Sequence, residues 1–229
     1  FLNNNRNKQS ITIDLKDKRG KDVLLKLVES CDVVVQNFRP GVVERIGIAY
    51  DDVKKVKHDI IYLSISGFGE KGPYSQKPTY DPIVQALSGL TTVQAGSDQE
   101  RPRLIRTIVP DKVTALTASQ AMTAGLLSKY RTGEGQHIRL SMLDAVIAFM
   151  WSSDMGGQTY VGKQVSAQRA ASFIDLIYET KNGYMSVSTM TNAQWAGLSR
   201  AAEKPDWLDD ERFQSAELRD FNINDRLEL

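Results

Sequence analysis

The chain has 229 residues, of which 41% are hydrophobic and 25% are charged. This composition is typical of a folded globular protein and excludes an intrinsically disordered chain. The 29 Lys and Arg residues nearly balance the 28 Asp and Glu residues, leaving a formal net charge of +1, so we expect no nucleic-acid partner. No stretch approaches the roughly 18 apolar residues of a membrane helix, so we expect no membrane insertion.

The few cysteines and histidines argue against a disulfide-rich protein and against a metalloprotein. The single cysteine, Cys31, excludes an internal disulfide framework and a cysteine-clustered zinc site. His58 and His137 lie far apart in the sequence, so we expect no bound metal. These features predict a reducing compartment, the cytoplasm. The chain opens at Phe1 and closes in charged, helix-like sequence, so we expect it to be part of a longer protein.

Strands and helices alternate at the start of the chain. Residues 11–15 alternate apolar and polar, as in a short strand, and residues 21–30 carry apolar side chains at helical spacing. Residues 33–35 predict a buried strand, residues 42–46 a second helical segment, and residues 60–65 the clearest strand of the sequence. This order predicts βαβ units and therefore a parallel sheet.

The next part continues the pattern. Residues 67–79 are rich in glycine and proline and predict a loop, and residues 80–90 can form a helix with Pro82 in its first turn. Residues 112–131 predict a long helix rich in small side chains, suited to close packing. A short strand at 137–140 and an apolar helix from 143 follow. The predicted fold class is α/β, with a Rossmann-like parallel sheet.

The character of the sequence changes after residue 155. We predict a large α/β domain over 1–155, a linker over 156–170 and the start of a smaller α+β domain over 171–229. Asn182-Gly183 between two apolar runs predicts a β-hairpin, with the positive φ angles of the turn supplied by these two residues.

A literal G-x-G-x-x-G runs from Gly67 to Gly72, directly after a predicted strand. In a dinucleotide-binding fold a helix begins at the third glycine, and an acidic residue follows about 20 positions later. Here Pro73 follows at once, and Asp81 comes too early. An NAD-binding module remains an alternative, but the motif favours a surface loop at the carboxyl end of a strand, where α/β folds bind ligands.

Three further places carry candidate chemistry. Arg39 and Arg45 follow a strand and either form a cationic rim for phosphate or lie on a solvated turn. Asp111 stands before the 112–131 helix, where it is either a simple N-cap or an ionised nucleophile. Tyr80 either donates a hydrogen bond to a substrate carboxylate or packs, and Asp81 before Pro82 has an N-cap arrangement.

Many short segments, in order along nearly the whole chain, resemble the family III CoA-transferases, which include formyl-CoA transferase and carnitine CoA-transferase. The matching segments are Asn5-Arg6-Asn7-Lys8 with Ile11-Thr12-Ile13-Asp14-Leu15, Val34-Val35-Gln36-Asn37-Phe38-Arg39-Pro40-Gly41 with Arg45 and Gly47, Ser64-Ile65-Ser66-Gly67-Phe68-Gly69 with Gly72-Pro73-Tyr74, Tyr80-Asp81, Asp111, Arg131-Thr132-Gly133-Glu134-Gly135-Gln136 with Ser141, Arg212-Phe213 and Arg219.

The resemblance implies an enzyme that moves CoA from an acyl-CoA donor to a small carboxylic acid, with CoA as substrate and no permanently bound cofactor. It implies that Asp111 is the nucleophile, which attacks the thioester and forms a mixed anhydride and then an aspartyl-CoA thioester. It also implies an interlocked homodimer, of which this chain is a fragment.

The resemblance assigns binding roles as well. Asn37 and Phe38 match the segment that lines the CoA site, and Arg45 matches an arginine that meets the CoA phosphates. The family carries a cationic residue just before the Tyr–Asp pair; here Lys77 is separated from that pair by two residues, and we assign it to CoA binding. Tyr80 matches a residue near the acyl or carboxylate group.

The same fold includes α-methylacyl-CoA racemases, which move an α-proton with a His–Asp pair. This chain has Tyr80-Asp81 at that place. A tyrosine is a poor base near neutral pH because its pKa is about 10. Racemisation therefore remains the alternative, and CoA transfer is favoured.

Overall fold

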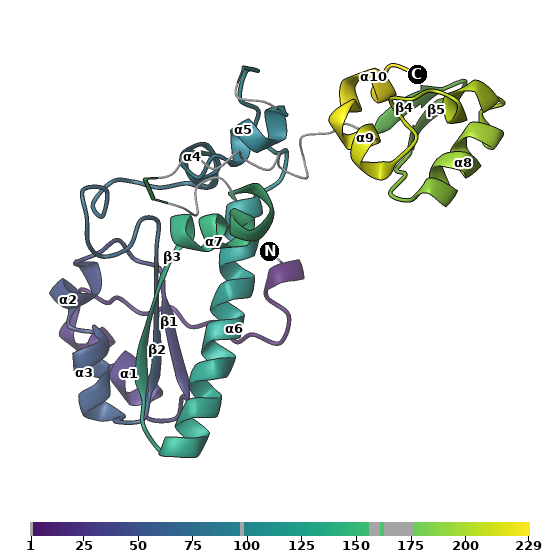
Figure 1. Ribbon diagram of the computed structural model, residues 1–229. Helices are drawn as coiled ribbons and strands as arrows, with labels where there is room; N and C mark the ends of the chain where they lie inside the picture. Colours follow the sequence, from purple (N-terminus) through teal and green to yellow (C-terminus); the bar gives the residue numbers. More distant parts are fainter. Residues whose placement is uncertain (1, 97–98, 156–160, 163–175) are drawn as a thin grey trace. The chain divides into compact units, whose positions relative to one another are not determined.

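The structure is a computed structural model that describes residues 2–96, 99–155, 161–162 and 176–229 (Figure 1). Two compact units make up the chain, Phe1–Phe173 and Ile174–Leu229, and each is described by itself. Apart from 161–162, the predicted linker over 156–170 lies outside the described residues. No helix in the described ranges is long and apolar enough to cross a membrane.

The first unit is built on a three-stranded parallel sheet in the order β1-β2-β3. Its strands are β1 (Val33–Gln36), β2 (Ile61–Ser66) and β3 (Gln136–Ser141). In register, Val33 lies beside Ile61, and Ile61 lies beside Gln136. The predicted parallel α/β arrangement is confirmed. Because the strands run in one direction, their carboxyl ends meet at one edge of the sheet.

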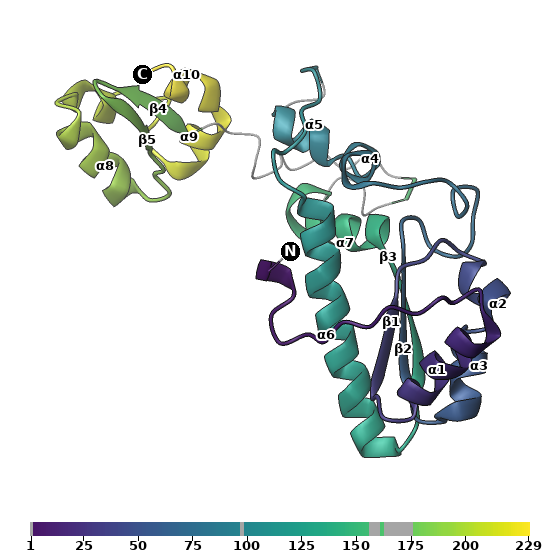
Figure 2. The same cartoon turned by 180° about the vertical axis from the view of Figure 1, so that it is seen from behind.

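Helices cover both faces of this sheet (Figures 1 and 2). On one face lie α1 (Lys18–Val28), α2 (Val42–Ile46) and α3 (Tyr50–Val56). The core on this side contains Val28, Val53, Ile60 and Tyr62, with Leu25, Val34 and Tyr50 packed against it. Burial of these side chains holds the layers together, since each contributes about 1.5–3 kcal/mol.

The long helix α6 (Val109–Thr132) covers the opposite face. Gly125 allows its close approach, because a Cβ there would lie 3.1 Å from Ile138 Cδ1 and 3.3 Å from Ile61 Cγ2. Near the end of the helix, Lys129 Nζ is 2.8 Å from Asp59 Oδ2 and 2.9 Å from Asp32 Oδ1. Since these aspartates precede β2 and β1, the ion pairs tie α6 to the amino ends of the strands.

A second apolar cluster lies where α6 begins. It joins α4 (Asp81–Leu87), α5 (Leu90–Ala95) and α7 (Met142–Asp154) through Val84, Leu90, Val146 and Met150. Val109, the first residue of α6, packs against this cluster. The predicted helix over 80–90 is divided into α4 and α5 at Gly89, whose φ of +84° favours glycine.

The predicted strand over 11–15 is wrong. Residues 11–14 have no strand partner among the described residues, and Ile11 is 63% exposed. The chain instead turns, and Asp17 caps α1 by accepting the Arg19 N–H at 2.8 Å. Alternation alone does not make a strand, because the backbone groups of a strand need partners in a neighbouring one.

The second unit contains the predicted hairpin, formed by β4 (Ile177–Thr180) and β5 (Gly183–Ser186). Thr180 pairs with Gly183, so the two turn residues are Lys181 and Asn182 rather than Asn182-Gly183. The described part of the unit also contains the α-helices α8 (Asn192–Ala201), α9 (Ala216–Phe221) and α10 (Ile223–Leu227), and the 3-10 helix η4 (Pro205–Leu208). Another 3-10 helix, η1 (Leu2–Asn4), belongs to the first unit.

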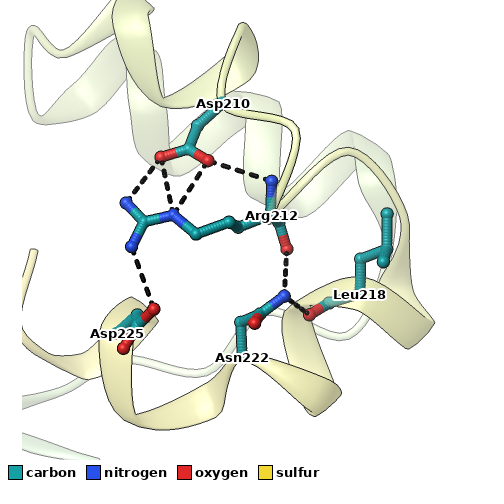
Figure 3. Close-up of polar contacts among 5 residues, drawn as sticks. All are labelled: Asp210, Arg212, Leu218, Asn222 and Asp225. Atoms are coloured by element: carbon teal, nitrogen blue, oxygen red, sulfur yellow. Dashed lines mark hydrogen bonds and ion pairs between the residues drawn. The ribbon is translucent and has the colours of Figure 1, made fainter.

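Arg212 ties the last helices of the second unit together (Figure 3). Its Nη2 is 2.8 Å from Asp210 Oδ2, and its Nη1 donates to Asp225 of α10 at 2.9 Å. Asn222 Nδ2 donates both to the Arg212 carbonyl at 3.1 Å and to the Leu218 carbonyl at 3.0 Å. The guanidinium fork therefore fixes the loop before α9 against α10.

Arg219, by contrast, is buried within the second unit, with 1% of its surface exposed. It donates to the Phe213 carbonyl at 2.8 Å and to Asn192 Oδ1 at 2.7 Å. Its guanidinium carbon lies 5.7 Å from the centre of the Trp195 ring. A buried cation needs such partners, so packing within this unit explains Arg219. The ion pairs with Asp210 and Asp225 explain the exposed Arg212.

We predict that Gly125→Leu destabilises the full-length protein by about 1–3 kcal/mol, because the larger side chain must displace Ile138 or Ile61. Thermal unfolding followed by circular dichroism measures the effect. Ala124→Leu, on the exposed side of the same helix, is the matched control. Equal melting temperatures for the two variants would contradict close packing at Gly125.

Candidate active site

Gly67 organises the carboxyl edge of the sheet. It follows the last residue of β2, and its carbonyl accepts the Leu143 N–H at 3.1 Å and the Ser141 hydroxyl at 3.4 Å. A Cβ on Gly67 would overlap the Thr79 side chain, so only glycine fits. The 67–79 loop thus returns to the end of β2 and places Tyr80 beside it.

The other glycines of this loop also serve its turns. Gly69 and Gly72 have φ angles of +82° and +94°, and residues 71–77 form bends and turns rather than a helix. The next helix, α4, begins only at Asp81. The G-x-G-x-x-G therefore lacks the helix amino terminus that receives the pyrophosphate in dinucleotide-binding folds.

A cavity of about 220 Å³ opens at the ends of β1 and β2. It combines an apolar surface with polar and charged groups, as ligand sites do. Six of the residues that line it are Gln36, Phe38, Arg39, Ser64, Glu70 and Gln76. Phe38 is 43% exposed, so its ring is available to a ligand.

A hydrogen-bond chain crosses the three strands beneath this cavity. Gln36 Nε2 donates to Ser64 Oγ at 2.9 Å, and Gln36 Oε1 accepts the Phe38 N–H at 2.8 Å. Ser64 Oγ lies 2.8 Å from His137 Nε2. Burial lowers the pKa of His137, so its ring is neutral at pH 7 and shares one hydrogen bond with the Ser64 hydroxyl. Ser64 and His137 are 73 residues apart in the sequence, and the pairing of β2 with β3 brings them together.

The residues assigned to CoA stand at or beside the cavity. Phe38 lines it, and Asn37 is exposed next to Phe38. Arg45, on α2, reaches back so that its Nη1 would lie 3.8 Å from a Cβ on Gly41, another lining residue. Lys77 follows the lining residue Gln76, and its Nζ lies 3.7 Å from the centre of the Tyr74 ring.

Asp111 is the third residue of α6, not its N-cap, so the N-cap interpretation is wrong. The helix begins at Val109 because Val109 packs into the apolar cluster and Pro110 is tolerated in a first turn. Its cap residue, Ile108, makes no side-chain cap hydrogen bond. Asp81 is likewise the first residue of α4, and Tyr80 stands at the cap position.

Asp81 and Asp111, 30 residues apart in the sequence, are brought together. Asp81 is buried, with 7% of its surface exposed, and its Oδ2 accepts the Asp111 N–H at 3.3 Å. Its other oxygen, Oδ1, accepts from Gln85 Nε2 at 2.7 Å. No sequence pattern signals this pairing; the acidic residue at the head of each of two predicted helices was the only available hint.

The Asp111 carboxylate is exposed, and among the described residues none donates a hydrogen bond to it. Partial burial and the charge of Asp81 raise its pKa above the usual range of an aspartate. Such a carboxylate is more basic than usual and accessible from solvent, which suits a nucleophile. Tyr80, beside Asp81, is 69% exposed. Neither Asp111 nor Tyr80 is among the described residues that line the cavity.

No three His, Cys, Asp or Glu side chains within the described residues gather as they would around a metal ion. Cys31 is a free thiol. Near the starts of α4 and α6, the carboxylate of Asp111 and the phenol of Tyr80 are exposed.

Comparison with known proteins identifies the family. A model described as CoA-transferase family III matches residues 1–228. Succinyl-CoA:glutarate CoA-transferase from Mus musculus is 33% identical over 235 residues, covering all of this chain and 52% of that protein. Acetyl-CoA:oxalate CoA-transferase from Acetobacter aceti is 38% identical over 146 residues, covering 64% of this chain and 38% of that protein.

A solved structure gives the same result for the fold. The crystal structure of a hypothetical protein, Rv3272, from Mycobacterium tuberculosis is similar with a TM-score of 0.84 at 28% identity. The match covers 98% of this chain and 60% of that one. The chain spans about half the length of the curated relatives that match all of it. Over its whole length, this chain belongs to CoA-transferase family III.

Proposed function

We propose that the protein transfers CoA from an acyl-CoA donor to a small carboxylic acid, with Asp111 as the covalent nucleophile. The observation that carries this proposal is the exposed carboxylate of Asp111, held in the first turn of α6 with a raised pKa. Membership of CoA-transferase family III supplies the reaction class. Relatives named for succinyl-CoA and glutarate, and for acetyl-CoA and oxalate, support small dicarboxylic acids as substrates.

The proposed reaction moves CoA from the donor acid to the acceptor acid in four steps. The Asp111 carboxylate attacks the donor thioester, CoA leaves as a thiolate, and a mixed anhydride remains on Asp111. The thiolate then attacks the aspartyl carbonyl, which releases the donor acid and leaves an aspartyl-CoA thioester. The acceptor carboxylate attacks this thioester and again expels the thiolate. Attack of the thiolate on the acceptor acyl carbonyl gives the new acyl-CoA and restores Asp111.

We assign the cavity at the ends of β1 and β2 to CoA. Phe38 offers a ring for apolar contact, Asn37 stands beside it, and Arg45 and Lys77 supply charge for the phosphates. Tyr80 is assigned to the acyl or carboxylate group, because it lies next to Asp81 and is exposed. CoA is a substrate here, and no permanently bound cofactor is proposed.

We further propose that the protein acts as a homodimer in the cytoplasm. Large apolar side chains on the outer side of α6 support a partner surface: Leu116 is 73% exposed, Leu127 59% and Tyr130 90%. The free thiol of Cys31 suits a reducing compartment.

Replacing the nucleophile tests the mechanism. We expect Asp111→Asn to lower turnover by at least about 10³-fold, in the range that loss of a covalent nucleophile produces. Asp144, the third residue of α7 and also exposed, offers the matched control variant Asp144→Asn, which should keep wild-type turnover. CoA exchange between succinyl-CoA and a panel of acids measures turnover, and mass spectrometry detects the acyl adduct on Asp111. Full turnover in Asp111→Asn would refute the assignment.

The same variant has a predictable effect on stability. The raised pKa means that folding disfavours the charged form of Asp111, so wild-type stability falls as the pH rises through that pKa. Asp111→Asn should therefore raise the melting temperature at pH 7, and the gain should disappear as the pH is lowered and the wild-type carboxyl takes up a proton. Asp144→Asn should lower it slightly, because a carboxylate in a first turn is stabilising. Scanning calorimetry at several pH values measures whether each variant raises or lowers the melting temperature.

The CoA assignment predicts a selective defect in Phe38→Ala. Loss of an apolar contact worth about 1–2 kcal/mol should raise KM for the acyl-CoA roughly 5- to 30-fold and leave KM for the acceptor acid unchanged. Phe221→Ala removes an equally large ring that is 85% exposed on α9, and it should change neither constant. A wild-type KM for acyl-CoA in Phe38→Ala would remove Phe38 from the CoA site.

A further inference from the structure

The first turn of α6 is held differently from those of α7 to α9. The helices α7, α8 and α9 begin with a Ser or Thr that accepts a backbone N–H of its own first turn: Ser141, Thr191 and Ser215. The cap residue of α6, Ile108, has no such side chain, and the Asp111 N–H donates instead to Asp81 of α4. A local cap fixes a helix to its preceding residue, whereas Asp81 fixes α6 to another helix.

Gln85 extends this hold to the segment before α6. Its Oε1 accepts the Ile105 N–H at 2.9 Å, and its Nε2 donates to the Thr107 carbonyl at 3.2 Å as well as to Asp81 at 2.7 Å. Gln85 is 2% exposed and Asp81 is 7% exposed. Both side chains are thus turned away from solvent, and their hydrogen bonds go to the segment that carries Asp111.

We propose that Asp81 and Gln85 are positioning residues, which clamp residues 105–111 to α4 so that the Asp111 carboxylate is presented in one place. This inference rests on the function proposed for Asp111. The Asp111 N–H donates to one oxygen of the Asp81 carboxyl group at 3.3 Å, and the shorter bond from Gln85 to the other oxygen, at 2.7 Å, holds that group in place. Misplacement of a reacting group by about 1 Å can cost about 10²-fold in rate, so the clamp has a kinetic consequence.

The clamp also sets the electrostatic surroundings of the nucleophile. Partial burial raises the pKa of Asp111, and the nearby carboxyl group of Asp81 raises it further. The neighbouring cation on α6, Lys112, donates to Thr107 Oγ1 at 2.9 Å. The electrostatic effect of Asp81 on Asp111 can be tested separately from the hydrogen bonds of the clamp. A substitution at Gln85 removes hydrogen bonds from the clamp but leaves the Asp81 carboxyl group in place.

Two variants of the full-length protein test the inference. Asp81→Asn keeps the shape but replaces one accepting oxygen by an amide group, so either Gln85 or the Asp111 N–H loses its acceptor. We expect kcat to fall about 10- to 100-fold, KM for acyl-CoA to stay within about threefold, and the acid limb of the kcat profile to move to lower pH. Gln85→Met keeps the volume; it should lower kcat similarly without moving that limb to lower pH.

Ser88→Ala is the matched control, because Ser88 is buried beside α4 and its hydroxyl donates to the Gln85 carbonyl without touching Asp81. It should keep the wild-type kcat and pH profile. Wild-type kcat and an unmoved acid limb in Asp81→Asn and Gln85→Met would overturn the inference, even if both melt earlier. Should Asp81→Asn fail to fold, Gln85→Met decides the question.

The Asp111→Asn variant keeps the two proposals distinguishable. If it is inactive while the variants at Asp81 and Gln85 behave as wild type, the positioning role fails and the nucleophile stands. If Asp111→Asn retains turnover, the proposed function fails, and the positioning role fails with it.

Discussion

The placement of α6 is the constraint on which the site depends, because this helix carries Asp111 in its first turn. Three separate contacts hold it. Lys129 ties its end to Asp59 and Asp32 at the amino edge of the sheet. Gly125 lets its middle lie directly on Ile61 and Ile138. At the start of α6, the Asp111 N–H donates a hydrogen bond to Asp81. A helix fixed at both ends and in the middle leaves little freedom to the carboxylate, which is the form of preorganisation that catalysis requires.

The same arrangement works against stability. An aspartate in a first turn is ordinarily stabilised by the helix dipole, but partial desolvation and the nearby Asp81 carboxyl group reverse the balance at Asp111. Two carboxyl groups drawn together are kept only where something compensates. Here the hydrogen bond from Gln85 compensates for the burial of the Asp81 carboxyl group. No described residue donates a hydrogen bond to the carboxylate of Asp111. An exposed carboxylate in unfavourable electrostatic surroundings, such as that of Asp111, is more typical of a reactive residue than of a structural helix cap.

The sequence predicts the layers well because their signals are local. Apolar runs mark β1 and β2, small side chains mark α6, and the order of elements implies parallel strands. The prediction failed where the answer depends on distant partners. Residues 11–15 alternate like a strand but have no strand partner within the described ranges. Val109 draws the start of α6 upstream by packing into a cluster built from α4, α5 and α7. The same holds for the site: Asp111 and Phe38 can be found from motifs, whereas Asp81, Gln85 and the Gln36–Ser64–His137 chain require the fold.

Charge sorts the two ends of the proposed substrate. The cationic groups Arg39, Arg45 and Lys77 stand at or beside the cavity, where the phosphates of CoA would lie, although Glu44 and Glu70 also line it. Glu70 is paired with Arg139 at 2.7 Å, while Asp81 and Asp111 carry the acidic groups at the other end. A thioester carbonyl is neutral, so two adjacent carboxylates do not repel it. An acceptor acid is an anion and would be repelled by the free Asp111. Acylation of Asp111 removes that charge before the acceptor has to approach. In the proposed reaction, the covalent step therefore also admits the second substrate.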